Sequence, residues 1–364
     1  MRYLVIRLSA FGDVAMTLPV LYAVARANPE HRFTLLTMPV LTSLLLEAPP
    51  NVEAMAIDIR HDEKGLMGLL SFASRLADES FDRMIDLHDV LRSRVLRYYL
   101  RLRGVRSVHL HKPRKKRTML ATIPPLKRKK PIGSMIERYA AVFRAAGLRF
   151  DFSLQPVSPT ICLPEVAIRE AEKRSLAGIS LPDACRRVGI APFAAHKSKT
   201  YPIECMEEVV AELSRGGDIQ VCLFGGRGQE AEILDTWATK YPCTYSVAGK
   251  LSLPDEIALM QTLSCMVSMD SANMHFASLV GCRVLSIWCA THPYMGFLGY
   301  GQSMSDAITL DLDCSPCSVF GNKPCHRRDY ACRRLPPSMI TEKILRAIEI
   351  EYETDKSDRS QRVE

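Results

Sequence analysis

The segment from Cys265 to Trp288 constrains the fold of this chain most strongly. It reads as an apolar strand, a polar turn at Asp270 and Ser271, a helix of small residues up to Gly281, and a second apolar strand. Two strands joined by one helix form a βαβ unit, and such units build parallel sheets. Asp270 should lie at the carboxyl end of its strand, where open α/β sheets bind ligands. The first turn of the helix suits a phosphate, although Ser271 could simply cap the helix.

The rest of the chain repeats this alternation of strands and helices on both sides of a proline-rich stretch, residues 150–164. A length of 364 residues with 47% hydrophobic content is enough for two domains with ordinary cores. We therefore predict an α/β protein with two Rossmann-like domains, residues 1–155 and 156–337, whose parallel sheets face each other across a cleft.

The sequence shows no membrane span or secretory signal. The longest uncharged stretch near the start, residues 33–46, is too short to cross a bilayer and contains Pro39. Arg2, Arg7 and Asp13 interrupt the apolar start of the chain. We expect a cytoplasmic protein, and eight cysteines scattered singly through the apparent strands and helices are consistent with a reducing compartment.

Positive charge is concentrated in one segment. Residues 92–136 contain fifteen Lys or Arg and no Asp or Glu. Since the net charge of the whole chain is +8, the remaining residues have a net charge of 8 − 15 = −7. We expect residues 111–131, with Pro124 and Pro125, to form a mobile exposed loop of the first domain that meets an anionic partner, unless it is only a solvated surface. The segment lacks the interleaved aromatic residues of a stacking surface, so a nucleic-acid partner is not expected and nucleic-acid binding is kept as the non-enzymatic alternative.

Two sets of polar residues should gather at sheet edges. In the first domain, Asp13 follows the opening strand and Gly12, while Asp86 and His88 end another strand. A single glycine excludes both the dinucleotide and the Walker motif, and Asp13 could merely cap its helix. In the second domain, a lysine turn, a diglycine turn and an acid share one edge, which suits a sugar linked to a pyrophosphate: Lys197, Lys199, Gly225, Gly226 and Asp270.

Four segments in chain order resemble glycosyltransferase family 9, the ADP-heptose:lipopolysaccharide heptosyltransferases. They are residues 7–19 (RLSAFGDVAMTLP), residues 199–202 (KTYP), the turn at residues 224–226 followed by Glu230, and residues 270–275 (DSANMH). This resemblance implies the GT-B architecture, with a C-terminal helix over residues 338–352 packing back on the first domain. We expect a disordered tail after it, residues 353–364.

The resemblance also implies a reaction. Family 9 enzymes transfer a sugar with inversion and without a metal, so we expect no cofactor and a nucleotide-sugar donor, with ADP-heptose first. The expected acceptor is an anionic lipid-linked glycan such as the lipopolysaccharide inner core, with peripheral contact at the cytoplasmic face of the inner membrane. Another nucleotide sugar, or a GT-B-type nucleotide-sugar epimerase, is the alternative.

Candidate residues follow from these segments. We expect Asp13 to act as general base and Lys199 to stabilise the leaving diphosphate. The donor should contact Lys197, Lys199, Gly225, Gly226, Glu230, Asp270, Ser271, Ala272, Asn273, Met274 and His275. The acceptor should contact Ser9, Gly12, Asp86, His88, Arg92, Arg114, Lys115, Lys116 and Arg117.

Four further cysteines cluster near the end of the second domain: Cys314, Cys317, Cys325 and Cys332. Their spacing is compatible with a structural zinc site, with disulfide or redox pairing, and with unligated packing thiols. The expected catalysis does not require any of the three.

Overall fold

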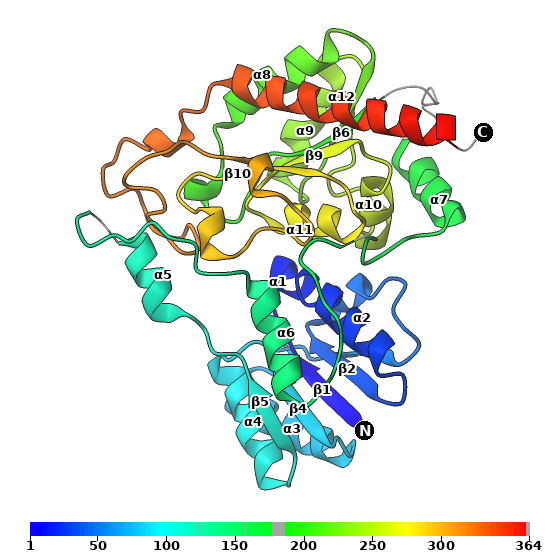
Figure 1. The fold of residues 1–364 in the computed structure, drawn as a ribbon, viewed down its shortest axis with the longest axis vertical. Helices are drawn as coiled ribbons and strands as arrows, with labels where there is room; N and C mark the ends of the chain where they lie inside the picture. The colour runs from blue at the N-terminus through cyan, green and yellow to red at the C-terminus, as the bar shows by residue number, and fades with distance from the viewer. Residues whose placement is uncertain (123, 157, 177–185, 362–364) are drawn as a thin grey trace. The chain divides into compact units, whose positions relative to one another are not determined.

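The computed structural model in Figure 1 describes residues 1–122, 124–156, 158–176 and 186–361, with side chains up to Glu349. The chain forms two compact units. Unit 1 comprises Met1–Arg114 and Gly133–Ile161, and unit 2 comprises Lys115–Ile132 and Cys162–Glu364. Each unit contains one parallel sheet with interleaved helices, so the α/β prediction is confirmed. The cleft between the sheets stays a prediction.

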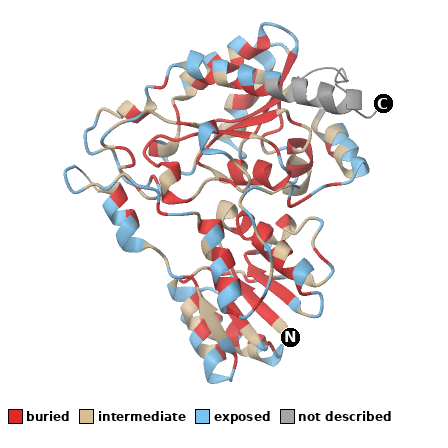
Figure 2. Ribbon diagram, in the orientation of Figure 1, coloured by how far each residue is buried: buried red, intermediate tan, exposed pale blue. Residues whose placement is uncertain are grey.

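Unit 1 is built on five parallel strands in the order β3-β2-β1-β4-β5. Their bounds are β1 Arg2–Ile6, β2 Arg32–Thr37, β3 Val52–Ala56, β4 Arg83–Asp86 and β5 Arg106–His109. The central β1 pairs with β2 and β4, and Val5 lies between Leu35 and Ile85. A strand with neighbours on both sides and helices over both faces must be apolar throughout, and β1 is buried from Tyr3 onward, as Figure 2 shows.

Helices cover this sheet where the sequence predicts amphipathic segments. They are α1 Phe11–Ala15, α2 Leu18–Ala27, α3 Gly65–Asp78, α4 Leu91–Leu102 and α6 Met135–Ala145, with a 3₁₀ segment over Pro39–Leu44. The start of α6 is fixed by a capping box. The hydroxyl of Ser134 accepts from the Ile136 N–H, and the Glu137 carboxylate accepts from the Ser134 N–H at 3.3 Å.

Unit 2 is built on six parallel strands in the order β11-β10-β9-β6-β7-β8. Their bounds are β6 Arg186–Ala191, β7 Ile219–Leu223, β8 Thr244–Ser246, β9 Cys265–Met269, β10 Val284–Ile287 and β11 Ala307–Ile308. The βαβ unit expected for residues 265–288 is present as β9, α11 (Ala272–Leu279) and β10, and the paired strands are parallel. The two short strands β8 and β11 were not predicted.

The helices of unit 2 are α5 Arg114–Ala121, α7 Glu165–Leu176, α8 Ile203–Ser214, α9 Gln229–Lys240, α10 Leu253–Met260, α11 and α12 Pro337–Gln361. The sequence predicts a helix over residues 165–178; α7 is described up to Leu176, and residues 177 and 178 lie outside the described residues. Side chains from β6, β7, β9 and β10 form the core with those of α8 and α12.

Two expectations about the chain's organisation were wrong. Residues 111–131 are not a loop of the first domain, because they contain α5, which buries Arg117 and Leu120, and because Lys115–Ile132 belongs to unit 2. Helix α12 continues to Gln361, where a disordered tail from residue 353 was expected. Within unit 2 this helix packs on α8 and β9, and its packing on the first domain stays a prediction.

The described helices include none with both the length and the apolar character that crossing a bilayer requires.

Candidate functional site

Each sheet has one switch point, where the order of its strands reverses. In unit 1 the chain adds β2 and β3 on one side of β1 and then β4 on the other side. In unit 2 it adds β7 and β8 on one side of β6 and then β9 on the other side. Ligands of open α/β sheets bind at the carboxyl ends of the strands beside such a point. The predicted residues Asp13 and His88 follow β1 and β4, and Lys199 and Asp270 follow β6 and β9.

Asp13 lies in the first turn of α1 and is held by an arginine and a tyrosine. The Arg7 guanidinium contacts Asp13 Oδ2 at 2.5 Å, and the Tyr139 hydroxyl donates to Oδ1 at 3.4 Å. Arg7 is buried and also donates to the Leu87 carbonyl oxygen at 2.7 Å. Burial is the largest effect on the pKa of Arg7 and lowers it, but Asp13, Tyr139 and Asp86 together more than offset burial, so the pKa is raised. The arrangement holds the Asp13 carboxylate, 27% exposed, in an ion pair at the sheet edge.

His88 and Asp86 have different environments at the end of β4. Burial, followed by the charge of Arg7, lowers the pKa of His88 to about 3, so its ring is neutral near pH 7. Asp86 is fully buried and forms an ion pair with Arg97 at 2.8 Å. Its Oδ1 accepts from the N–H groups of His88 and Asp89, both at 2.9 Å. Asp86 therefore shapes the turn that carries His88, and its contact with the acceptor stays a prediction.

The remaining residues assigned to the acceptor are divided between the units. Ser9 and Gly12 are partly exposed beside Asp13, and Arg92 is exposed on α4. Arg114, Lys115 and Lys116 are exposed on α5. Arg117 is instead buried, with its guanidinium 4.5 Å from the centre of the Phe297 ring, so it anchors α5 to unit 2.

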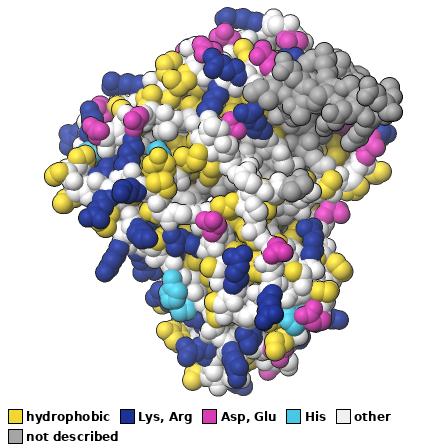
Figure 3. Space-filling view, in the orientation of Figure 1, with side chains coloured by type: hydrophobic (Ala, Val, Ile, Leu, Met, Phe, Trp, Pro, Cys, Tyr) yellow, Lys and Arg dark blue, Asp and Glu magenta, His cyan; other side chains and the backbone are white. Residues whose placement is uncertain are grey.

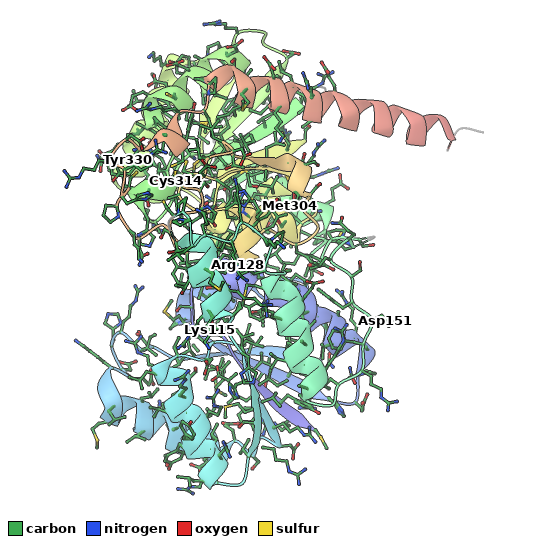
Figure 4. The ribbon with its side chains drawn as sticks, turned by 60° about the vertical axis from the view of Figure 1, so that its left-hand side comes forward. Lys115, Arg128, Asp151, Met304, Cys314 and Tyr330 are labelled. Atoms are coloured by element: carbon green, nitrogen blue, oxygen red, sulfur yellow. The ribbon has the colours of Figure 1, made fainter. Side chains whose placement is uncertain are left out.

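Later members of the basic segment are partly used by unit 2 itself. The Lys127 ammonium donates to the carbonyl oxygens of Cys314 and Pro316, and Lys129 forms an ion pair with Asp311. Arg128 and Lys130 are exposed. Figure 4 labels Lys115 at the start of α5 and Arg128 beyond its end.

Lys199 and Asp270 form an ion pair across the switch point of unit 2. The Lys199 ammonium lies 2.8 Å from Asp270 Oδ2 and 3.3 Å from the Asp270 carbonyl oxygen. The Thr291 hydroxyl also donates to Oδ2, at 2.7 Å. Because an ammonium group has three protons, one remains for an oxygen of a ligand. Asp270 is buried, and its carboxylate serves to position Lys199.

The turn that carries Lys199 is fixed by later segments of unit 2. The Ala290 N–H donates to the Ser198 carbonyl oxygen at 3.1 Å, and the Arg333 guanidinium donates to the Thr200 carbonyl oxygen at 2.8 Å. Gly321 has a φ of +71°, and a Cβ there would overlap the Lys199 side chain. The lysine is therefore held along its whole length. Lys197, two residues earlier, is exposed.

The diglycine turn after β7 approaches α9 closely. A Cβ on Gly225 would lie 2.9 Å from Leu234 Cδ1. The Glu230 carboxylate accepts from the Gly226 N–H at 2.7 Å, so this acid is used to hold the turn. At the start of α11, Ser271, Ala272 and Asn273 are partly exposed, whereas the side chains of Met274 and His275 are buried.

A model of glycosyltransferase family 9 (heptosyltransferase) matches residues 69–324. The chain belongs to glycosyltransferase family 9. It is therefore a heptosyltransferase-like glycosyltransferase, as the four sequence segments indicated. Lipopolysaccharide heptosyltransferase 1 of Pseudomonas aeruginosa is 25% identical over 330 residues, covering 87% of this chain and 86% of the relative.

Solved structures of similar enzymes share the fold of this glycosyltransferase. A family 9 glycosyltransferase from Veillonella parvula matches with a TM-score of 0.73 at 19% identity, covering 95% of this chain and 97% of that one. The ADP-heptose lipopolysaccharide heptosyltransferase II of E. coli matches with a TM-score of 0.68 at 18% identity, covering 97% and 100%. The GT-B class of fold expected from the sequence is confirmed.

Several residues of the glycosyltransferase site were not assigned a role from the sequence. Arg7 and Tyr139 contact Asp13, Thr291 contacts Asp270, and Gly321 lies against the Lys199 side chain. Tyr139, Thr291 and Gly321 lie far from these partners in the chain. Arg7 could have been found, since an arginine that directly follows a buried strand, six residues before Asp13, needs an acidic partner.

The cysteine cluster of the glycosyltransferase surrounds a cavity of about 10 Å³ within unit 2, together with Cys289 and Tyr330. Cys314 and Tyr330 are labelled in Figure 4. Burial raises the pKa of the Cys332 thiol to about 12. No described cysteine forms a disulfide, and the described His, Cys, Asp and Glu residues include no group of three placed to hold a metal ion. Zinc binding, disulfide or redox pairing, and unligated packing thiols all stay predictions.

Proposed function

We propose that this glycosyltransferase moves a heptosyl group from ADP-heptose to a hydroxyl of an anionic, lipid-linked glycan, with inversion at the anomeric carbon. The observation that carries the proposal is the pair of switch points. An acid held in an ion pair, Asp13, occupies one of them, and a cation held by an acid, Lys199, occupies the other. ADP-heptose is proposed because the name of the similar E. coli enzyme includes this donor.

In the proposed reaction, Asp13 accepts the proton of the acceptor hydroxyl while the hydroxyl oxygen attacks the anomeric carbon. A bond forms between that oxygen and the carbon, and the bond from the carbon to the diphosphate oxygen breaks on the opposite face. Arg7 and Tyr139 fix the direction of the Asp13 carboxylate. Proton transfer to a positioned carboxylate contributes about 10²–10⁴-fold to the rate.

Negative charge grows on the departing ADP, and we assign its stabilisation to Lys199. The remaining proton of the ammonium and the backbone N–H groups at the start of α11 suit phosphate oxygens. Asp270 and Thr291 act on this lysine as positioning residues. A fixed positive charge that needs no reorganisation can replace a divalent cation in this role, so we propose transfer without a metal.

The exposed cations of the basic segment are assigned to the acceptor. Arg114, Lys115 and Lys116 on α5 suit phosphate or carboxylate groups of an anionic glycan. Neutralising Lys115 and Lys116 together should raise KM for a phosphorylated acceptor and leave KM for the donor unchanged. The matched control is Lys173→Gln, which removes a surface charge from α7.

The experiment that tests the function is transfer from ADP-heptose to a deacylated acceptor, with ADP binding measured in parallel by calorimetry. Asp13→Asn should lower kcat by about 10²-fold or more and leave ADP affinity unchanged. Lys199→Ala should weaken ADP binding. Asp62→Asn and Lys240→Ala, at exposed positions, are the matched controls.

Three outcomes would contradict the proposal. A fully active Asp13→Asn enzyme would reject the base assignment, and unchanged ADP affinity in Lys199→Ala would reject the diphosphate assignment. If ADP-heptose were turned over without an acceptor, the reaction would be that of an epimerase or hydrolase. A panel of nucleoside diphosphates in the same calorimeter tests the base of the donor, and loss of activity in EDTA would refute metal independence.

A further inference from the structure

The exposed apolar side chains of unit 1 are concentrated on two helices. Leu66 and Met67 at the start of α3 are 60% and 78% exposed, and Leu91, Tyr98 and Leu102 on α4 are 79%, 57% and 88% exposed. Helices α3 and α4 pack against each other. Large apolar side chains this exposed, and this close together, indicate an interaction surface rather than scattered surface residues.

The three residues of α4 form a single stripe. At 100° per residue, Leu91, Tyr98 and Leu102 fall within about 40° of one another, over roughly 17 Å of helix. Val95 lies in the same direction and is partly exposed. The opposite face of α4 holds Leu96 and Leu100, which are buried. The helix therefore has a second apolar face that unit 1 does not use.

Arginines border this stripe. Arg92 and Arg101 are exposed and have no acidic partner among the described residues, and Arg103 is exposed and donates to the Tyr99 hydroxyl at 3.2 Å. No Asp or Glu occurs between residues 90 and 105. In Figure 3 basic and hydrophobic side chains lie side by side at the end of unit 1 that carries α4.

We propose that the α3–α4 surface, formed by Leu66, Met67, Leu91, Tyr98 and Leu102 with Arg92, Arg101 and Arg103, docks on an anionic lipid bilayer. The apolar stripe enters the boundary between headgroups and acyl chains, and the arginines contact lipid phosphates. Exposed aliphatic side chains bordered by arginines favour a lipid surface over nucleic acid, which would require stacking or a charged track. The inference gives the lipid-linked acceptor of the proposed function a docking site in unit 1.

The surface differs from the basic segment of unit 2. There Lys127 and Lys129 are bound to groups of the protein and Arg117 is buried. The basic segment also has exposed apolar side chains, but only two large ones, Met119 and Leu126. The α3–α4 surface combines exposed arginines with five large exposed apolar side chains on two helices that pack together, which is the combination that an interfacial helix needs.

The test is co-sedimentation of the full chain with vesicles of phosphatidylethanolamine and phosphatidylglycerol, and with vesicles of phosphatidylcholine alone, in the absence of substrates. The unaltered chain should bind the anionic vesicles more tightly. Leu91→Ser/Leu102→Ser should weaken this binding by about tenfold or more. Arg92→Gln/Arg101→Gln should weaken it similarly and remove most of its salt dependence.

Control variants at other exposed positions distinguish binding by this surface from non-specific binding to vesicles. Val166→Ser removes a 68% exposed apolar residue from unit 2, and Lys115→Gln/Lys116→Gln removes two exposed charges from α5. Both should retain binding. Equal vesicle binding by the unaltered chain and Leu91→Ser/Leu102→Ser would overturn the inference, and so would binding to RNA in place of vesicles. Transfer to a deacylated acceptor should be unchanged in Leu91→Ser/Leu102→Ser, so the surface and the proposed function can fail independently.

Discussion

Replacing Lys199 by Met should destabilise unit 2 as well as weaken nucleotide binding. The change leaves the Asp270 carboxylate, 7% exposed as a side chain, with the Thr291 hydroxyl but without its positive partner. Removing one member of a buried ion pair costs about 3–5 kcal/mol. The Lys199 side chain is 16% exposed, so water can offset part of this loss. We expect a cost of about 2–3 kcal/mol in the free energy of unfolding.

The assay uses the position of the tryptophans. The chain contains two, Trp237 and Trp288, and both are buried in unit 2. Urea unfolding followed by tryptophan fluorescence therefore reports on unit 2 even if unit 1 unfolds separately. A double-mutant cycle compares Lys199→Met, Asp270→Asn and the two together. Because each single change leaves a buried group without its partner, the double variant should lose less than the sum, with a coupling of about 1–2 kcal/mol.

An exposed pair in the same unit is the control. Lys240 and Glu207 are 2.7 Å apart, close to the 2.8 Å between Lys199 and Asp270, but their side chains are 57% and 28% exposed. The cycle of Lys240→Met and Glu207→Gln should give a coupling below about 1 kcal/mol. If the coupling at Lys199 and Asp270 were as small as at this control pair, or if Lys199→Met were as stable as the unaltered chain, the assignment of Asp270 as the partner that positions Lys199 would be refuted.

Three further outcomes are expected. The folded pKa of His88, about 3, lies below its unfolded value, so protonation of the unfolded chain should lower the free energy of unfolding as the pH falls below about 6.5. In urea unfolding followed by circular dichroism, His88→Gln should therefore lose about 1–2 kcal/mol less than the unaltered chain between pH 7 and pH 5. Identical losses in the two proteins would contradict this. Gly321→Ala should weaken ADP binding in calorimetry, because both the φ of +71° at this position and the Lys199 side chain exclude a Cβ. The control is Gly217→Ala, where φ is +74° but no atom lies within reach of a Cβ; this change should only destabilise the fold. Protein dialysed against a chelator should keep its unfolding midpoint and contain no stoichiometric zinc by mass spectrometry. One tightly held zinc per chain would instead show that the cysteines around the cavity bind a metal ion.

The sequence was sufficient for those features that depend on local patterns. Runs such as Tyr3–Ile6 are apolar on both faces and must be central parallel strands, and a polar residue that follows such a run must emerge at the ligand-binding edge. Asp13, His88, Lys199 and Asp270 could be found in this way. The family could also be recognised, because its motifs lie at these same strand ends.

Tertiary structure decided how those residues are used. Asp86 is the last residue of β4 and Asp270 follows β9, so both lie at strand ends. Each is buried and paired with a cation inside its own unit, Asp86 with Arg97 and Asp270 with Lys199, because a carboxylate away from water requires a positive partner. Helix α12 has an apolar face that could have covered either unit, and its packing on α8 is a long-range contact that no local pattern specifies. The arginines of α4 likewise differ in their use. Asp86 and Asp89 form ion pairs with Arg94 and Arg97. These acids do not pair with Arg92 and Arg101, which are exposed to solvent.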